Sequence, residues 1–222
     1  MSKVAILTDT NSGITAKTAH DYGVYVLPTP FYIDGKLYLE GVDLDEDLFF
    51  EKQLNDADIS TSMPSPGDVT DKWDELLCDH DEIVYIPLSS ALSSSYQTAK
   101  VMAEEDYEGK VFVCDNQSIS VTMKMAVLEA KRLADEGKSA KEIAKYIEDQ
   151  KKEHIIYVMV DTLKYLKKGG RVTPAVAAIG SLLKIKPILK IYGDKLDSFK
   201  KARTDKQAIS IMIESLEEFI SD

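Results

Sequence analysis

The stretch that decides the fold is Ile83-Val84-Tyr85-Ile86-Pro87-Leu88-Ser89-Ser90-Ala91-Leu92-Ser93-Ser94-Ser95-Tyr96-Gln97-Thr98-Ala99. An apolar, β-rich run ends at Pro87, a loop with five serines follows, and a helical pattern then begins. Strand, loop and helix in this order are typical of an α/β unit, in which backbone N–H groups gather at the mouth of the loop. The stretch therefore predicts an anion site, and an ordinary helix cap in a polar loop is the alternative interpretation.

Within this loop, Ser93 is the expected N-cap of the helix. Its side-chain oxygen can accept from the free N–H groups of the first helical turn. The hydroxyl groups of Ser94 and Ser95 then stay available to a ligand, and the expected ligand is a carboxylate or a phosphate.

A second group of hydroxyl side chains lies at residues 59–68. Pro66 suits the first position of a helix, so Ser65 is the expected cap, and Thr61 and Ser62 lie outside that helix. Spare hydroxyls beside a helix start are candidates for ligand contact, although such clusters are more often plain loops.

The rest of the chain predicts an α/β fold with two lobes. Apolar runs alternate with helical patterns through residue 152, which favours a mainly parallel sheet with helices on both faces in residues 1–152. In residues 153–222 two apolar runs flank Gly193-Asp194, which predicts a strand hairpin in a smaller α/β lobe. Thr204 is the expected cap of a final amphipathic helix, with Ile209, Met212, Ile213, Leu216 and Ile220 on one side.

The composition restricts the kind of partner. The formal net charge of -11 repels nucleic acid and anionic membranes, and we expect neither as a partner. No apolar run of the length of a membrane-spanning helix occurs in the sequence. The two cysteines, Cys78 and Cys114, lack metal-binding spacing and fit a reducing compartment, so we expect a cytoplasmic protein.

Motifs for catalysis, metals and nucleotides are missing from the sequence. Ser93 lacks a Gly-x-Ser-x-Gly elbow, and Asn11 stands where a phosphatase-type Asp-x-Asp needs its second aspartate. Asp9 is therefore interpreted mainly as a holder of loop N–H groups. No catalytic residue, metal or other cofactor is predicted, and a small-molecule hydrolase, an esterase or phosphatase that uses Ser93 or Asp9, stays open as the alternative.

A basic cluster interrupts the acidic background at Lys164, Lys167, Lys168 and Arg171. Such a cluster is either a solvated helix face or a docking surface for an acidic partner or a phosphate. A regulatory interaction module acting through this surface is a third, weaker hypothesis.

Four motifs, taken in order, resemble the DegV family. They are residues 61–65 (Thr-Ser-Met-Pro-Ser), 92–99 (Leu-Ser-Ser-Ser-Tyr-Gln-Thr-Ala), 161–172 (Asp-Thr-Leu-Lys-Tyr-Leu-Lys-Lys-Gly-Gly-Arg-Val) and 183–189 (Leu-Lys-Ile-Lys-Pro-Ile-Leu). The resemblance implies a two-lobe, DegV-like, fatty-acid-binding fold. Some members are the acyl-carrying subunit of a bacterial fatty acid kinase, so the implied role is that of a carrier and not of an enzyme.

The resemblance also implies roles for individual residues. Thr61 and Ser93 match the hydroxyls that bind the carboxylate of a long-chain fatty acid, whose tail lies between the lobes. Ser62, Ser94 and Ser95 line the same pocket, and Arg203 takes the family's basic position after the hairpin. A separate ATP-binding kinase subunit phosphorylates the carboxylate to an acyl phosphate. The surface formed by Lys164, Lys167, Lys168 and Arg171 is then a docking face for that subunit.

The chain departs from the family pattern at several positions. Ser94-Ser95 replaces Gly-Thr, Asn116 replaces a serine, and members usually continue past the position of Asp222 with a further C-terminal segment that helps to close over the carboxylate. The expected fold therefore lacks this usual C-terminal segment. The chain is then a short member of the family, a fragment, or a member with a more open head-group site. The helix predicted over 174–183, with Met123, Met125 and Leu128, could line a lipid tunnel or form plain core.

Overall fold

A computed structural model describes residues 2–172, 176, 185–193 and 195–221. The chain divides into two compact units, Met1–Lys151 and Lys152–Asp222. The boundary expected from sequence lies after residue 152. The helix predicted over 174–183 lies, except for Val176, outside the described residues.

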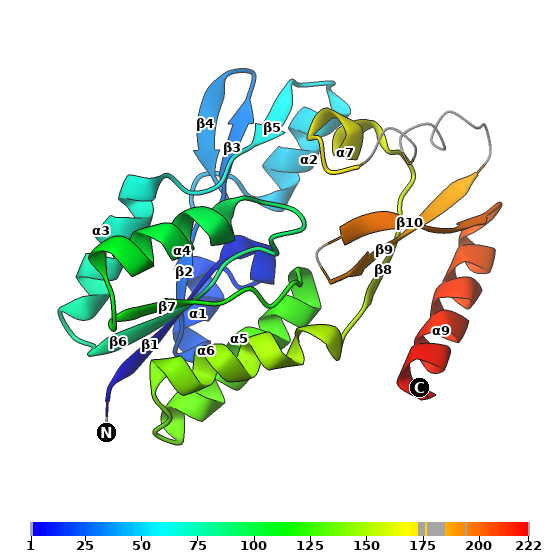
Figure 1. Cartoon of the computed structure of the whole chain (residues 1–222). Helices are drawn as coiled ribbons and strands as arrows, with labels where there is room; N and C mark the ends of the chain where they lie inside the picture. The colour runs from blue at the N-terminus through cyan, green and yellow to red at the C-terminus, as the bar shows by residue number, and fades with distance from the viewer. Residues whose placement is uncertain (1, 173–175, 177–184, 194, 222) are drawn as a thin grey trace. The chain divides into compact units, whose positions relative to one another are not determined.

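The first unit is built on a four-stranded parallel sheet with the order β2-β1-β6-β7 (Figure 1). Its strands are β1 (Val4–Asp9), β2 (Tyr25–Leu27), β6 (Glu82–Ile86) and β7 (Val111–Val113). The helices between and after them are η1 (Thr10–Ser12), α1 (Ala16–Tyr22), α3 (Pro66–Leu77), α4 (Ser95–Asp106), α5 (Ser120–Asp135), α6 (Ala140–Asp149) and η2 (Gln150–Lys152). The predicted α/β fold with a parallel sheet is confirmed.

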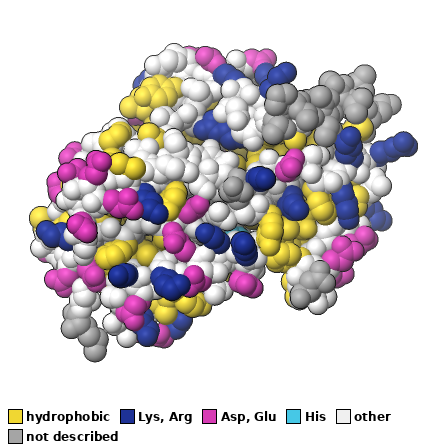
Figure 2. All heavy atoms as spheres, viewed as in Figure 1, with side chains coloured by type: hydrophobic (Ala, Val, Ile, Leu, Met, Phe, Trp, Pro, Cys, Tyr) yellow, Lys and Arg dark blue, Asp and Glu magenta, His cyan; other side chains and the backbone are white. Residues whose placement is uncertain are grey.

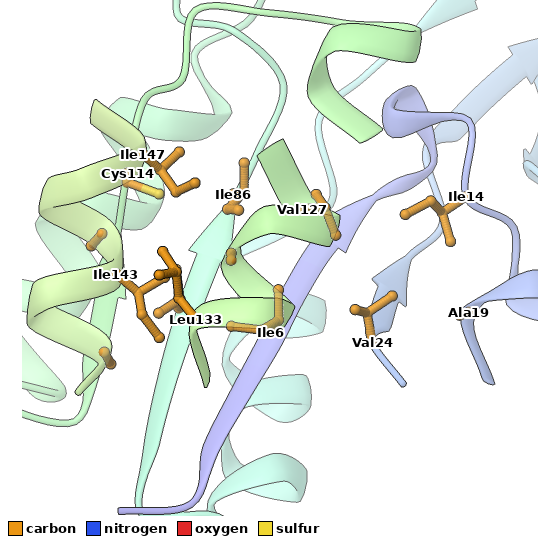
Figure 3. Packing of buried hydrophobic residues seen from close by; sticks show 14 residues of the cluster. Ile6, Ile14, Ala19, Val24, Ile86, Cys114, Val127, Leu133, Ile143 and Ile147 are labelled. Atoms are coloured by element: carbon orange, nitrogen blue, oxygen red, sulfur yellow. The ribbon is translucent and has the colours of Figure 1, made fainter. Parts of the chain in front are cut away.

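Helices cover both faces of this sheet because successive strand side chains point to opposite sides. Ile6 of β1 packs in a cluster with residues of α1, α5 and α6. Its neighbours Ala5 and Leu7 pack in a second cluster with residues of α3 and α4. Figure 3 shows the first cluster, in which Val127 of α5 lies beside β1 and Ile143 of α6 faces the sheet. The two clusters fix the strand ends from which the candidate site is built.

A small antiparallel sheet of order β4-β3-β5 also belongs to the first unit. It contains β3 (Pro30–Ile33), β4 (Lys36–Leu39) and β5 (Ile59–Thr61), and α2 (Glu46–Leu54) lies between the last two in sequence. Asp34 and Gly35 join β3 to β4 with φ values of 50° and 78°. Left-handed conformations at both positions are what a two-residue hairpin turn needs, and an Asp-Gly dipeptide between two alternating runs predicts such a turn.

Helix α2 is capped by Asp45, whose carboxylate accepts from the Leu48 N–H at 2.8 Å. Residues 59–61, for which a plain loop was the alternative to ligand contact, form β5 because they pair with β3. The predicted cap Ser65 is confirmed, since its hydroxyl accepts from the Asp68 N–H at 3.1 Å.

The second unit contains an antiparallel sheet of order β10-β9-β8. Its elements are β8 (Ile156–Met159), α7 (Lys164–Lys168), β9 (Lys186–Tyr192), β10 (Lys195–Ala202) and α9 (Asp205–Ser221). The predicted hairpin of β9 and β10 is confirmed. The Thr204 hydroxyl accepts from the Gln207 N–H at 3.2 Å, as expected of the cap of α9.

The apolar side predicted for α9 does not pack as one face. Ile211 and Met212 pack on the sheet with Ala208. Ile209, Ile213, Leu216 and Ile220 are exposed by 48%, 51%, 37% and 81%. The helix carries apolar residues on two sides, and the sheet covers the side that contains Ala208.

The helices of the described residues were compared with the requirements of a membrane span. None of them combines the length and the apolar character that a bilayer crossing requires.

The charged side chains are mixed on the surface. Acidic and basic side chains are interspersed over the face shown in Figure 2.

Candidate functional site

The candidate site lies in the first unit, where β1 and β6 run side by side and end at the same edge of the sheet. From β1 the chain continues to β2 on one side, and from β6 to β7 on the other. This is the topological switch point at which open α/β sheets usually bind ligands. The loop that follows β6, residues 88–95, is called the serine loop below.

The serine loop ends at the first turn of α4, one residue later than predicted. Ser94 is the N-cap residue, and its side chain makes no capping hydrogen bond. Ser93 still serves the helix start, because its Oγ accepts from the Ser95 N–H at 3.1 Å and lies 2.7 Å from the Ser95 Oγ. Ser94 is exposed, Ser93 is half-buried and Ser95 is buried.

The Thr61 segment lies against the serine loop. Thr61 ends β5 opposite Phe31 and is exposed, and the next N–H group, that of Ser62, donates to the Pro30 carbonyl at 3.1 Å. The Ser94 Oγ lies 3.6 Å from the Met63 Sδ, which brings the two hydroxyl-rich segments into contact. Segments 31 residues apart in sequence thus meet at one place.

A small cavity lies beside this contact. Its volume is about 10 Å³, and its lining includes Met63, Pro64, Tyr85, Ser95 and Met102. A volume of this size holds about one water molecule, so the cavity does not accommodate an acyl tail.

Asp9 fixes the start of the serine loop. Its carboxylate accepts from the Leu88 N–H at 2.8 Å and from the Asn11 N–H at 2.9 Å, as well as from the Asn11 side-chain amide at 2.8 Å. The interpretation of Asp9 as a holder of loop N–H groups is confirmed by these bonds. Because the side chain is buried, its pKa is raised to about 6, although the hydrogen bonds from Asn11 and Leu88 act in the opposite direction.

Asp115 holds the same loop from the other side, and sequence reasoning missed it. It follows β7, is buried, and accepts from the Ser90 N–H at 3.2 Å, from the Ser90 hydroxyl and from the Gln117 N–H at 3.1 Å. Its place at the carboxyl end of a strand beside β6 is the signal that could have found it.

The contacts of Ser93 give no support to a hydrolase. The hydrogen bonds of its hydroxyl in the described structure go to Ser95, and a histidine base takes no part in them. His80, one of the three histidines, contacts the Leu76 carbonyl and the Tyr25 hydroxyl instead. A catalytic serine needs a base within hydrogen-bond reach. Among the described residues, no group of three or more His, Cys, Asp and Glu side chains is arranged to hold a metal ion.

Comparison with known proteins gives the family. The family model described as "Uncharacterised protein, DegV family" matches residues 3–222. The chain belongs to the DegV family. A DegV domain-containing protein of Staphylococcus aureus (strain N315) is 33% identical over 222 residues, which are 100% of this chain and 79% of that protein.

Solved DegV structures are similar over nearly the whole chain. DegV of Bacillus subtilis, described as a fatty acid binding protein, is 30% identical with a TM-score of 0.87, and the match covers 100% of this chain and 79% of that one. A fatty acid binding DegV family protein of Streptococcus agalactiae is 28% identical with a TM-score of 0.88, over 100% of this chain and 80% of that one.

The other residues that the DegV resemblance selects lie in the second unit. Arg203 follows β10 and is exposed, and its N–H donates to the Gln207 side chain at 2.8 Å. Lys164, Lys167 and Lys168 are exposed on α7. Arg171 is half-buried, and its guanidinium donates to the Gly169 carbonyl at 2.6 Å. The ligand and docking roles of these residues stay predictions.

Proposed function

We propose that this chain binds a long-chain fatty acid and that Thr61 and Ser93 hold its carboxylate. The observation that carries the proposal is the contact between the Thr61 segment and the serine loop at Met63 and Ser94. The description of similar DegV proteins as fatty acid binding supports it.

The chemistry of the two segments suits a carboxylate. Hydroxyl groups donate hydrogen bonds to an ionised carboxylate, and such bonds are about twice as strong as those between neutral groups. Ser62, Ser94 and Ser95 supply further hydroxyls next to Thr61 and Ser93. The first turn of α4 adds backbone N–H groups and the positive end of the helix dipole.

The acyl tail supplies most of the affinity in this proposal. Burial of each methylene group contributes roughly 0.8 kcal/mol, so a long tail binds tightly even when the head-group site is modest. The head-group site then decides which amphiphile is accepted.

Substitution of the two hydroxyl residues tests the site. Thr61→Ala and Ser93→Ala should each weaken fatty acid binding by about 1 to 3 kcal/mol, the cost of a lost hydrogen bond to a charged group. Ser60→Ala is the matched control, because Ser60 is exposed on the same strand with its side chain on the opposite face. Titration calorimetry with one fatty acid measures all three. If the variant that combines Thr61→Ala with Ser93→Ala binds the fatty acid as tightly as the wild type does, the site assignment is wrong.

We also propose that the chain is a carrier subunit and not itself an enzyme. The bound carboxylate is presented to a separate ATP-binding kinase subunit, which transfers a phosphoryl group to it and forms an acyl phosphate. The basic surface of Lys164, Lys167, Lys168 and Arg171 docks that subunit. The support for this step is the motif resemblance together with the positive charge of α7 in an acidic protein.

A further inference from the structure

Asp115 holds the serine loop at Ser90, three residues before Ser93. The carboxylate lies at the end of β7, next to β6, and the residue is only 7% exposed. It accepts from both the N–H and the hydroxyl of Ser90. A buried carboxylate that receives several hydrogen bonds constrains the groups that donate them.

Ser89, the residue next to this contact, makes hydrogen bonds that reach Ser93. The Ser89 hydroxyl accepts from the Ala91 N–H at 3.1 Å. The Ser89 carbonyl accepts from the N–H groups of Leu92 and Ser93, at 2.9 and 3.1 Å. These bonds close a compact turn over residues 89–93 that contains Ser90, so a shift of Ser90 is transmitted through the turn to Ser93.

The opposite side of the loop is held independently. Asp9, at the end of β1, accepts from the Leu88 N–H and fixes the residue at which the loop begins. The loop is thus anchored at residue 88 from one neighbouring strand and at residue 90 from the other, while its last residues carry the hydroxyls. Loss of the Asp115 anchor leaves two other bonds in place, from the Leu88 N–H to Asp9 and from the Ser89 N–H to the Ser118 carbonyl at 3.3 Å. It removes the anchor at Ser90, which lies inside the turn that leads to Ser93.

We propose that Asp115 is a positioning residue for head-group binding: through Ser90 it holds the serine loop in the conformation in which Ser93 meets the carboxylate. This inference rests on the proposed function. It concerns the head group alone, so removal of the Asp115 anchor should affect ligands with a carboxylate and spare those that share only the tail.

The test compares myristic acid with myristyl alcohol, which has the same tail and no carboxylate. Asp115→Ala should weaken binding of the acid by about tenfold, the equivalent of one hydrogen bond, and leave binding of the alcohol unchanged. Asp115→Asn should restore the acid affinity, because the amide oxygen accepts from the Ser90 N–H and the Ser90 hydroxyl can turn to accept from the amide nitrogen.

Glu82→Ala is the matched control. The Glu82 carboxylate accepts from the Ala140 N–H at 3.3 Å, and Glu82 lies at the opposite end of β6 from the serine loop. Loss of this bond should change the affinity for neither ligand. If Asp115→Ala does not fold, Ser90→Ala removes one hydrogen bond of the same anchor and should show the same selectivity for the acid.

Each outcome separates this inference from the function on which it rests. A selective loss for the acid supports the positioning role. Equal loss for both ligands, unchanged affinity of Asp115→Ala, or failure of Asp115→Asn to restore binding would overturn it while wild-type binding stands. A wild type that binds neither ligand would overturn the proposed function and, with it, this inference.

Discussion

Asp9 and Asp115 show how single buried carboxylates shape the candidate site. Each lies at the end of a strand next to β6 and receives backbone N–H groups of the serine loop. Neither is expected to touch the ligand. Their contribution is to fix the serine loop, in which five of eight residues are serine.

The raised pKa of Asp9 predicts a pH dependence of stability. Burial brings the pKa to about 6, above its value in the unfolded chain, so folding takes up a proton between about pH 4 and pH 6. The contribution of Asp9 to the free energy of unfolding is therefore largest at low pH and is lost as pH rises through 6. Between pH 5 and pH 7 the loss should be roughly 1 kcal/mol.

Urea unfolding of the wild type and of Asp9→Asn measures this dependence. The stability of the wild type relative to the variant should fall from pH 5 to pH 7, because the asparagine does not titrate and the other groups cancel in the difference. A difference between the two proteins that stays constant over this range would contradict the assignment.

At the residue scale, sequence alone predicts the contacts that residues make with others close by in the chain. The Ser65 cap could be predicted because Pro66 marks the helix start, and its partner Asp68 lies three residues away. The contact of Ser90 with Asp115 spans 25 residues and exists only because β6 and β7 are adjacent. No local sequence pattern predicts such a contact, so sequence reasoning missed Asp115 as the second anchor of the loop.

At the scale of elements, turns were easier to predict than pairings. The β3–β4 hairpin follows from the chemistry of Asp34-Gly35, which is local. Strand β5 is three residues long and exists through pairing with β3, and its Ser-Thr composition resembles a loop. On α9 the periodicity shows that the helix is amphipathic but does not show which side the sheet covers.

Helix α7 carries the docking prediction. The double variant Lys167→Glu/Lys168→Glu reverses the charge at two exposed positions. It should weaken binding to an ATP-binding fatty acid kinase subunit by about tenfold or more at low salt. The effect should be smaller at high salt, because salt screens the charges. Lys195→Glu with Lys206→Glu makes the same charge change at exposed positions away from α7. Surface plasmon resonance measures both pairs. Equal weakening by the two pairs would show a general charge effect and not a docking surface.

At the scale of the whole molecule, the order of motifs was more informative than composition. Alternating strands and helices give the α/β class, and four motifs in sequence order indicate the DegV family, which the family model confirms over residues 3–222. Composition alone excludes few functions, since an acidic protein with an ordinary apolar content is compatible with many. The fatty acid ligand is inferred from the family and from the contact of two segments that lie far apart in the sequence.

The central claim is that this chain binds a fatty acid. Denaturing mass spectrometry of freshly purified protein, followed by delipidation and addition of a long-chain fatty acid, measures it most directly. We expect a long-chain fatty acid to be released from the purified protein and the delipidated protein to take up the added one. A preparation that releases no fatty acid and takes up none would contradict the account.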